Sequence, residues 1–123
     1  MSVGKGLARH GHVSYLEIPV LEMEKSAKFY ENIFGWDVQR RSATNVAFDD
    51  LSGDLIGRFV AGRTPSTDPG IMPYVYVDSV ETVARAIAHA GGEIVKAPHP
   101  EGNLTVATFR DPAGNVLGIW EAA

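Results

Sequence analysis

The chain closes on a turn and strand sequence at residues 111–121, Asp-Pro-Ala-Gly-Asn-Val-Leu-Gly-Ile-Trp-Glu. Its Pro-Ala-Gly-Asn part is typical of a tight turn, and the apolar run after it is typical of a buried strand. A related sequence, Ser-Gly-Asp-Leu-Ile-Gly-Arg-Phe, occupies residues 52–59 near the middle of the chain. The same turn, strand and internal glycine therefore occur twice, which indicates an internal repeat.

The segments before these two sequences also follow one order. In the first half, periodicity and turn residues predict a strand, a helix and three strands, at 12–18, 22–34, 36–40, 45–48 and 55–61. We expect Pro19 to end the first strand and Gly35 to cap the helix in the left-handed conformation. The corresponding segments of the second half are 72–77, 80–90, 93–97, 104–110 and 116–121.

The second helix has a predicted start and the two halves have a predicted border. Asp78 to Glu81 resembles a capping box, in which the Asp78 carboxylate accepts from free backbone amides and Glu81 reaches back. Residues 62–70 form a linker rich in proline and glycine. The sequence therefore predicts an α+β fold, with a flexible lead-in at 1–11 and a single domain at 12–121. This domain consists of two tandem βαβββ modules, 12–61 and 71–121.

Composition limits the classes of function. The chain has 123 residues, of which 45% are hydrophobic and 21% charged, as is typical of a globular protein. It has no cysteine, which excludes disulfides, thiolate metal sites and cysteine nucleophiles. A net charge of −4 argues against nucleic-acid binding, which usually requires a basic face. Without a signal peptide or an apolar run of roughly 20 residues, the chain is expected to be cytoplasmic, with no membrane partner.

Both helices and the closing sequence resemble those of a known family. Residues 26–36 read Ser-Ala-Lys-Phe-Tyr-Glu-Asn-Ile-Phe-Gly-Trp, and Tyr76-Val77-Asp78 leads into the second helix. Together with residues 111–121, these are similar to the vicinal oxygen chelate superfamily of glyoxalase I, bleomycin-resistance proteins and extradiol dioxygenases. The closing strand also resembles that of bacterial lactoylglutathione lyase-related proteins.

This resemblance covers about residues 12–121 and has implications for the architecture. It implies that the modules curl their mixed sheets around a cavity, and that a chain this short pairs as a homodimer. It does not specify an activity, because the fold hosts several chemistries as well as non-catalytic binders.

Metal-dependent members of the superfamily carry His, Gln or Glu at four strand positions. The resemblance places these positions at Val13, Gly57, Met72 and Gly118. None of them offers a nitrogen or oxygen ligand, and the Met72 thioether suits such ions poorly. We therefore expect no cofactor. The alternative is a Zn, Ni, Fe or Mn site displaced by one residue, with His12 as the nearest ligand, although strand alternation points His12 to the opposite face.

Strand alternation also predicts which side chains line the cavity. The inner set is largely aromatic and consists of Tyr15, Phe59, Met72, Tyr74, Tyr76 and Trp120. Two interpretations stay open. The rings either fill a closed core, or form a pocket for a planar or apolar small molecule with phenol hydroxyls as hydrogen-bonding groups. The second interpretation suits drug sequestration, as the resemblance to bleomycin-resistance proteins implies.

Glu17 is the one ionisable residue predicted on the inner face. Apolar walls would favour its neutral form, which could act as a general acid–base beside Tyr15 or Tyr74. The alternative is an exposed carboxylate at the rim. Elsewhere, three arginines are candidates to meet an anion, although isolated arginines usually serve surface pairing: Arg40, Arg41 and Arg58.

Three functions follow from these observations. The first is a glyoxalase-like protein with a degenerate metal site and an unassigned, lyase-related reaction. The second is a non-catalytic binder of an antibiotic-like small molecule. The third is a divalent-metal lyase or dioxygenase with displaced ligands.

Overall fold

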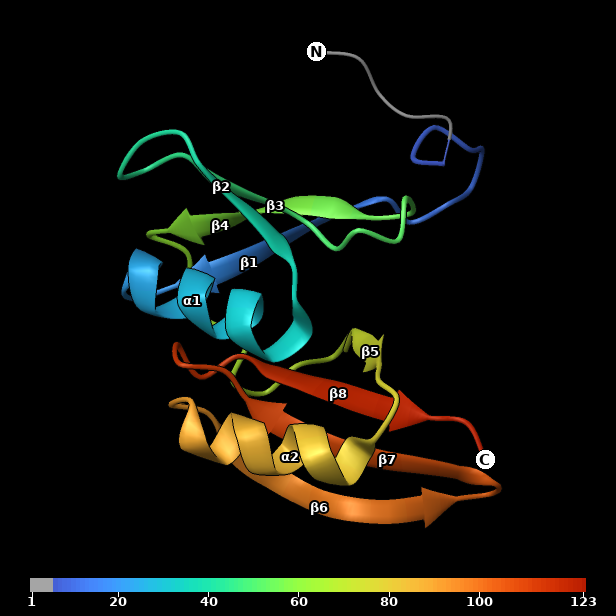
Figure 1. The fold of residues 1–123 in the computed structure, drawn as a ribbon. Coiled ribbons are helices and arrows are strands. Elements are labelled where there is room, and N and C mark those ends of the chain that lie inside the picture. Colours follow the sequence, from blue (N-terminus) through green and yellow to red (C-terminus); the bar gives the residue numbers. More distant parts are fainter. Residues whose placement is uncertain (1–5) are drawn as a thin grey trace. The chain divides into compact units, whose positions relative to one another are not determined.

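The computed structural model describes residues 6–123. The first half contains β1 (Tyr15–Val20), α1 (Met23–Phe34), β2 (Asp37–Arg40), β3 (Val46–Asp49) and β4 (Ile56–Ala61). The second half contains β5 (Tyr74–Tyr76), α2 (Val80–His89), β6 (Glu93–Glu101), β7 (Leu104–Arg110) and β8 (Val116–Glu121) (Figure 1). Each half has the predicted order, so the α+β fold of two βαβββ modules is confirmed.

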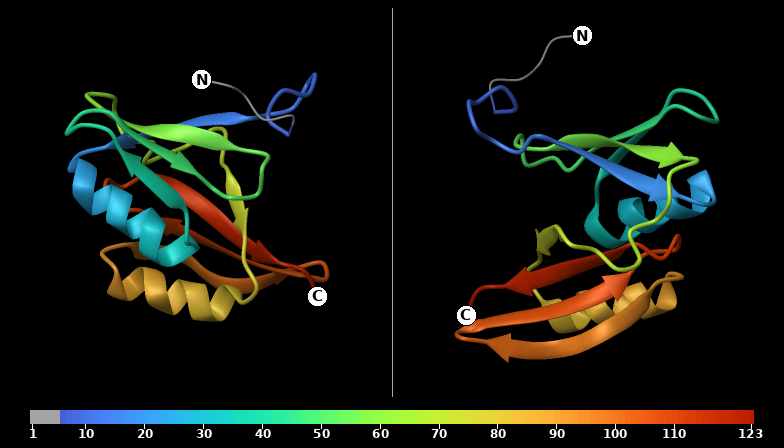
Figure 2. Two further views of the ribbon diagram at one scale, coloured as in Figure 1. Left: turned by 45° about the horizontal axis from the view of Figure 1, so that its top comes forward. Right: turned by 180° about the vertical axis from the view of Figure 1, so that it is seen from behind.

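The chain divides into two units, the first ending at Arg63 and the second beginning at Thr64. Each unit holds one four-stranded mixed sheet, with the strand orders β1-β4-β3-β2 and β5-β8-β7-β6. The first and fourth strands of each module pair in parallel, and the other neighbours are antiparallel. The helix of each unit lies on one face of that unit's sheet (Figure 2). The opposite face of each sheet is called its open face below.

Aromatic packing fixes the core of the first unit. The rings of Trp36 and Phe48 stack with centroids 4.8 Å apart, and Tyr30 of α1 lies 5.0 Å from Trp36 and 5.7 Å from Phe59. All four are buried. Gly35 ends α1 as predicted, with a φ of 72° and its amide bonded to the Glu31 carbonyl at 3.0 Å. Tyr30 and Trp36, on either side of that cap, thereby reach the same core.

The predicted cap of α2 is wrong by one residue. The helix begins at Val80, so Ser79 stands at the N-cap, and its hydroxyl accepts from the Thr82 amide at 3.2 Å. The Val80 amide donates to Oε1 of Glu121 at 2.8 Å. A carboxylate at the end of β8 therefore takes the place that the sequence assigned to Asp78 and Glu81.

Two strands run through prolines and differ in their bounds from the predicted ones. β1 starts at Tyr15 rather than at residue 12, and it continues through Pro19, which pairs in register with Val60. β6 extends to Glu101, past Pro98 and Pro100, with register shifts against β7. Both strands lie at the edges of their sheets. Proline has no backbone N–H to donate, and an edge strand tolerates this because one of its sides has no neighbouring strand to bond.

The turn of the closing sequence has a structural explanation. Asp111 is buried, and its Oδ1 accepts from the amides of Ala113 and Asn115 at 2.9 and 3.0 Å. The Asn115 side chain donates to Asp111 Oδ2 at 2.8 Å, and its carbonyl oxygen accepts from the Ser66 amide at 2.7 Å. Gly114 supplies a φ of 97°. These residues hold the start of β8 and fasten the preceding linker to it.

The sequence predicted a flexible lead-in at the start of the chain. The expected lead-in at 1–11 lies partly outside the described residues. Within residues 6–11, Arg9 forms an ion pair with Asp54 at 2.6 Å.

Neither described helix has the length and apolar character needed to cross a membrane.

Candidate functional site: the open faces of the two sheets

The open face of the second sheet brings three of the predicted aromatic residues together. Tyr74 pairs in register with Gly118, and Tyr76 with Trp120. Paired residues share a face of a sheet, so both tyrosines and Trp120 point away from α2, whereas Val75 and Ile119 point toward it. Tyr74 and Tyr76 are 47% and 52% exposed. Tyr74, Tyr76 and Trp120 are called the aromatic patch below.

Two rings of the aromatic patch are in direct contact, and the third lies over Gly118. Tyr76 and Trp120 meet edge to face, with centroids 5.0 Å apart and ring planes at 79°. The Tyr74 ring lies over Gly118, and a Cβ at that position would overlap the ring atoms. Gly118 therefore lets Tyr74 lie against the sheet beside the other two rings.

Polar side chains border the aromatic patch on the same face. Thr108 pairs with Gly118 and with Lys96, and His99 pairs with Val106, which is itself opposite Trp120. The His99 ring contacts the Ala97 carbonyl at 2.8 Å and a Glu101 oxygen at 3.3 Å. Sequence reasoning missed Lys96 and His99 as neighbours of the patch. The sequence predicted that β6 ends at residue 97. In addition, the register shifts of β6 break the simple alternation of side chains between the two faces.

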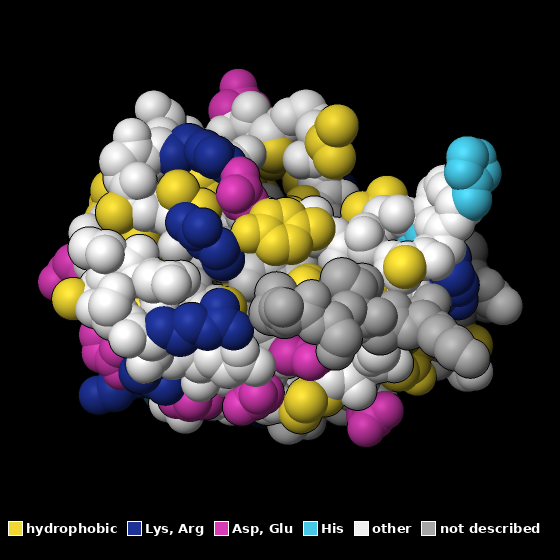
Figure 3. Space-filling model, turned by 90° about the horizontal axis from the view of Figure 1, so that it is seen from above, with side chains coloured by type: hydrophobic (Ala, Val, Ile, Leu, Met, Phe, Trp, Pro, Cys, Tyr) yellow, Lys and Arg dark blue, Asp and Glu magenta, His cyan; other side chains and the backbone are white. Residues whose placement is uncertain are grey.

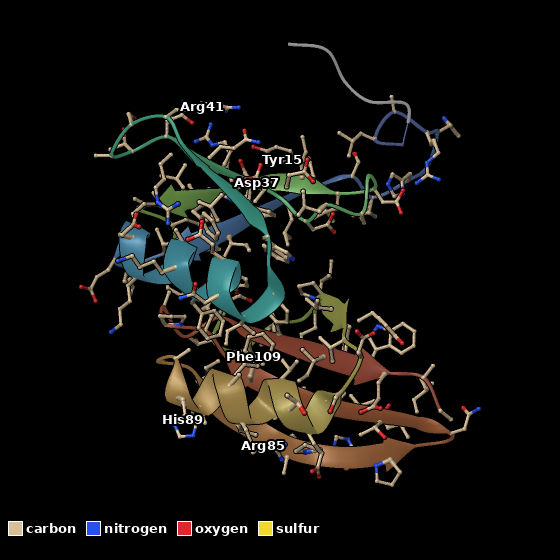
Figure 4. All side chains as sticks on the ribbon, viewed as in Figure 1. Tyr15, Asp37, Arg41, Arg85, His89 and Phe109 are labelled. Carbon is tan, nitrogen blue, oxygen red and sulfur yellow. The ribbon has the colours of Figure 1, made fainter. Side chains whose placement is uncertain are left out.

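In the first unit, the register corrects one predicted site residue. Tyr15 lies on the open face, 48% exposed and opposite Ile56 (Figure 4). Phe59 pairs with Ile18 and is fully buried on the face toward α1, 5.7 Å from Tyr30. The prediction counted β4 from Leu55, whereas the open-face residues begin with Ile56. Phe59 is therefore core and does not share a face with Tyr15.

Glu17 lies on the open face, but the predicted apolar walls are absent. Its register partner is Arg58. Its Oε1 accepts a hydrogen bond from Nη1 of Arg63 at 2.8 Å, within an ion pair whose two side chains are partly exposed. Glu17 is thus paired with a cation at a partly exposed position, and the apolar enclosure that the sequence predicted for it is not found.

The four positions implied for metal ligands lack donors in the structure too. Tyr15 pairs with Ile56 as Tyr74 pairs with Gly118, so the repeat equates Ile56, and not Gly57, with Gly118. Gly57 faces α1, where Phe48 fills the space beside it. Val13 and Met72 precede β1 and β5. None of these side chains carries nitrogen or oxygen, so they do not fit a divalent metal.

Histidines and carboxylates elsewhere do not supply such a centre either. Within residues 6–123, no three His, Cys, Asp or Glu side chains gather as a metal-binding group. The predicted alternative ligand, His12, lies before β1, so strand alternation does not apply to it. Its Nε2 contacts the Asp54 carbonyl oxygen in the loop before β4.

Comparison with known proteins identifies the family. Residues 11–119 match the profile of the Glyoxalase/Bleomycin resistance protein/Dioxygenase superfamily. The chain belongs to this superfamily. It is 27% identical over 122 residues to a glyoxylase-like domain-containing protein of Didymella fabae, covering 89% of this chain and 93% of that protein.

Two further relatives of this superfamily member come from Streptomyces. The anthracycline biosynthesis protein DnrV of Streptomyces peucetius is 25% identical over 130 residues, and the match spans 89% of this chain but only 46% of DnrV. TnmS3, an antibiotic binding protein from Streptomyces sp. CB03234, superposes with a TM-score of 0.70 at 23% identity. That superposition covers 95% of this chain and 99% of TnmS3, and it shows a shared fold.

Proposed function

We propose that this protein binds a planar, largely apolar small molecule on the aromatic patch. The observation that carries the proposal is the exposure of Tyr74 and Tyr76 beside the half-buried ring of Trp120, on a face that no element of their own unit covers. Adjoining exposed aromatic side chains are uncommon on a protein surface without a partner, and they mark binding sites.

The geometry of the patch suits a flat ligand. Aromatic pairs contribute about 0.5–1.5 kcal/mol beyond the burial of their area, and an incoming ring can contact both tyrosines and the indole. The absence of a side chain at Gly118 keeps the surface level beneath Tyr74. The tyrosine hydroxyls and the Thr108 hydroxyl give a ligand polar groups to bond at the edge of the patch.

Relatives support an antibiotic-like ligand class. One structural neighbour is an antibiotic binding protein and one relative takes part in anthracycline biosynthesis. Anthracyclines are polycyclic and planar, which matches the chemistry of three adjoining rings. We therefore name a polycyclic aromatic molecule as the ligand class, and we assign no reaction to the protein.

The proposal also makes predictions about metal content, about oligomeric state and location, and about catalysis. Binding is expected without a resident metal, because the implied ligand positions carry no donors. The chain is expected to be a cytoplasmic homodimer, and light scattering should then give twice its mass of 13.3 kDa. A lyase or dioxygenase reaction with displaced metal ligands has no observation in its favour.

Calorimetric titration with the anthracycline daunorubicin tests the proposal. We expect saturable binding that weakens about tenfold, or about 1.4 kcal/mol, in Tyr76→Ala and in Trp120→Leu. Leu21→Ala, which truncates an exposed apolar side chain of the first unit, is the control and should bind as the wild type does. Mass spectrometry of the recovered probe should show it unchanged. Equal affinity in all four proteins would refute the aromatic patch as the site.

A further inference from the structure

A row of polar side chains crosses the open face of the first sheet. The register places Gln39 of β2, Ala47 of β3, Arg58 of β4 and Glu17 of β1 opposite one another in sequence across the sheet. Arg63 joins one end of the row through its ion pair with Glu17. At the other end, Nη2 of Arg41 donates to Oε1 of Gln39 at 2.9 Å, and Figure 4 shows Arg41 on the side away from α1.

The three arginines of this face differ in how they are paired. Arg63 has a carboxylate partner, Glu17, at 2.8 Å. Arg41 has a neutral amide partner. The Arg58 side chain is exposed and, within residues 6–123, makes neither a hydrogen bond nor an ion pair, although Glu17 is its register partner. The carboxylate opposite Arg58 is therefore engaged by Arg63, and no carboxylate among residues 6–123 pairs with the guanidinium groups of Arg58 and Arg41.

Acidic groups of the same face lie in the neighbouring row. Asp37 and Asp49 pair with each other across β2 and β3, two residues along from the row that contains Arg58. Asp37 accepts from Gln39 Nε2 at 3.3 Å, and Asp49 accepts from the Leu51 amide at 2.8 Å. The face thus carries two carboxylates in one row and, in the next, Arg58 beside Glu17, with Arg41 and Arg63 joined to the two ends of that row. Figure 3 shows several basic side chains on this side, with an acidic one among them and hydrophobic ones beside them.

We propose that Arg58 and Arg41 bind an oxyanion, the carboxylate or phosphate group of a small molecule, on this open face. A guanidinium group offers a planar fork of donors that matches both anions in a bidentate manner. Ala47 lies between β2 and β4 and leaves space above the sheet. Strands spaced by about 4.8 Å put β2 and β4 about 10 Å apart. Arg41 follows β2 two residues beyond Gln39, so it is placed diagonally across Ala47 from Arg58, and two long side chains can reach toward each other over that distance.

The proposed anion site and the aromatic patch share no residue. The residues of the anion site belong to the first unit and those of the patch to the second. The anion site could therefore fail its test while the aromatic patch passes, and the reverse also holds. Its ligand chemistry is also different, because it selects for charge and not for ring area.

Titration of the whole chain with inorganic phosphate and, separately, with succinate tests the site by NMR of the arginine Nε–Hε groups. We expect a saturable shift of the Arg58 signal, and the anion that binds more tightly identifies the preferred group. Arg58→Ala should weaken binding at least tenfold and Arg41→Ala severalfold. Arg85→Ala, which removes an exposed arginine of α2, should have no effect. An unsaturable response, or equal loss in all three variants, would mean an adventitious ion only and would overturn the proposal.

Glu17→Gln supplies a second test with the opposite sign. The change removes the negative charge next to Arg58 and releases Arg63 from its ion pair, so anion affinity should rise severalfold. The matched control is Glu81→Gln, which breaks the exposed ion pair with Arg85 on α2 and should leave affinity unchanged. Unchanged or weaker binding in Glu17→Gln would contradict a site centred on Arg58.

Discussion

Gly57 and Gly118 occupy matching places in the repeated sequence, yet their surroundings are different. Gly57 points toward α1 and is closed in by the Leu16 carbonyl oxygen and the Phe48 ring. Gly118 is on the open face beneath Tyr74. The sequence repeat alone cannot separate them, because a shift of one residue in strand pairing moves a side chain to the other face. Only the register shows that Ile56 is the counterpart of Gly118.

Gly57→Ala is predicted to destabilise the protein by about 3 kcal/mol, since overpacking a tight core costs about 1–3 kcal/mol and backbone contacts leave little relief. The added Cβ would overlap the Leu16 backbone oxygen as well as the buried Phe48 ring. Urea unfolding followed by circular dichroism measures the change. A loss below about 1 kcal/mol would show that Gly57 is not enclosed as described.

Gly118→Ala should leave stability nearly intact but weaken binding on the aromatic patch. The three atoms nearest to the added Cβ all belong to the ring of Tyr74, which is 47% exposed and can swing outward. The cost in unfolding free energy is expected to stay below about 1 kcal/mol. Calorimetry with daunorubicin should show a severalfold higher Kd, because the displaced ring no longer lies level with Tyr76 and Trp120. Wild-type affinity in this variant would show that the position of Tyr74 is irrelevant to binding.

The elements themselves were largely predictable, and the exceptions have identifiable causes. Periodicity and turn residues gave β7 and β8 with their observed bounds, and Gly35 marked the end of α1. β6 was predicted too short because Pro98 and Pro100 normally exclude a strand, whereas an edge position admits them. The cap of α2 involves Glu121, which is far from Val80 in the sequence, so no local pattern could indicate it.

Arg40 is the main electrostatic link between α1 and β2. Its guanidinium group lies 2.9 Å from Glu24 and 3.2 Å from Glu31. Its hydrogen bonds and positive charge hold the pKa of Glu24 below the usual value, and the two carboxylates raise the pKa of Arg40. Because the side chains are partly exposed, the network should be worth about 1 kcal/mol.

Arg40→Gln is therefore predicted to lower the free energy of unfolding by about 1 kcal/mol at neutral pH. Since the folded pKa of Glu24 is lowered, its contribution is complete above the unfolded pKa and is lost as pH falls through the folded one. The difference between wild type and variant should thus vanish in strong acid, as measured by urea unfolding across a pH series. Arg85→Gln, which breaks a more exposed pair with Glu81, should cost less. A difference that is constant with pH would contradict the assigned pairing.

For the whole molecule, the family and the fold could be predicted from the sequence. The ion pairs on the open faces could not. Alternation correctly put Tyr74, Tyr76 and Trp120 on one face. It could not show that Arg63, from the segment after β4, reaches Glu17. It also misplaced Phe59 by a single residue. Aromatic content could thus be read from the sequence, whereas ion pairs between distant segments depend on the folded structure.

Metal retention is a second property of the whole molecule. Purified protein offered Zn, Ni, Fe or Mn and then dialysed should keep far less than one ion per chain, because the implied ligand positions lack donors. Elemental analysis gives the result, and His12→Ala should not change it. A stoichiometric ion that His12→Ala abolishes would restore the displaced-ligand enzyme as the leading interpretation.

The central claim, a ligand site on the aromatic patch, is tested most directly by the two indole N–H signals in a ¹H–¹⁵N NMR spectrum. Trp36 is buried in the core of the first unit, whereas Trp120 contacts Tyr76 on the open face of the second. Saturating daunorubicin should shift the Trp120 indole and the Gly118 amide and leave the Trp36 indole in place. Shifts confined to Trp36 and its neighbours, or no shifts at all, would contradict the account.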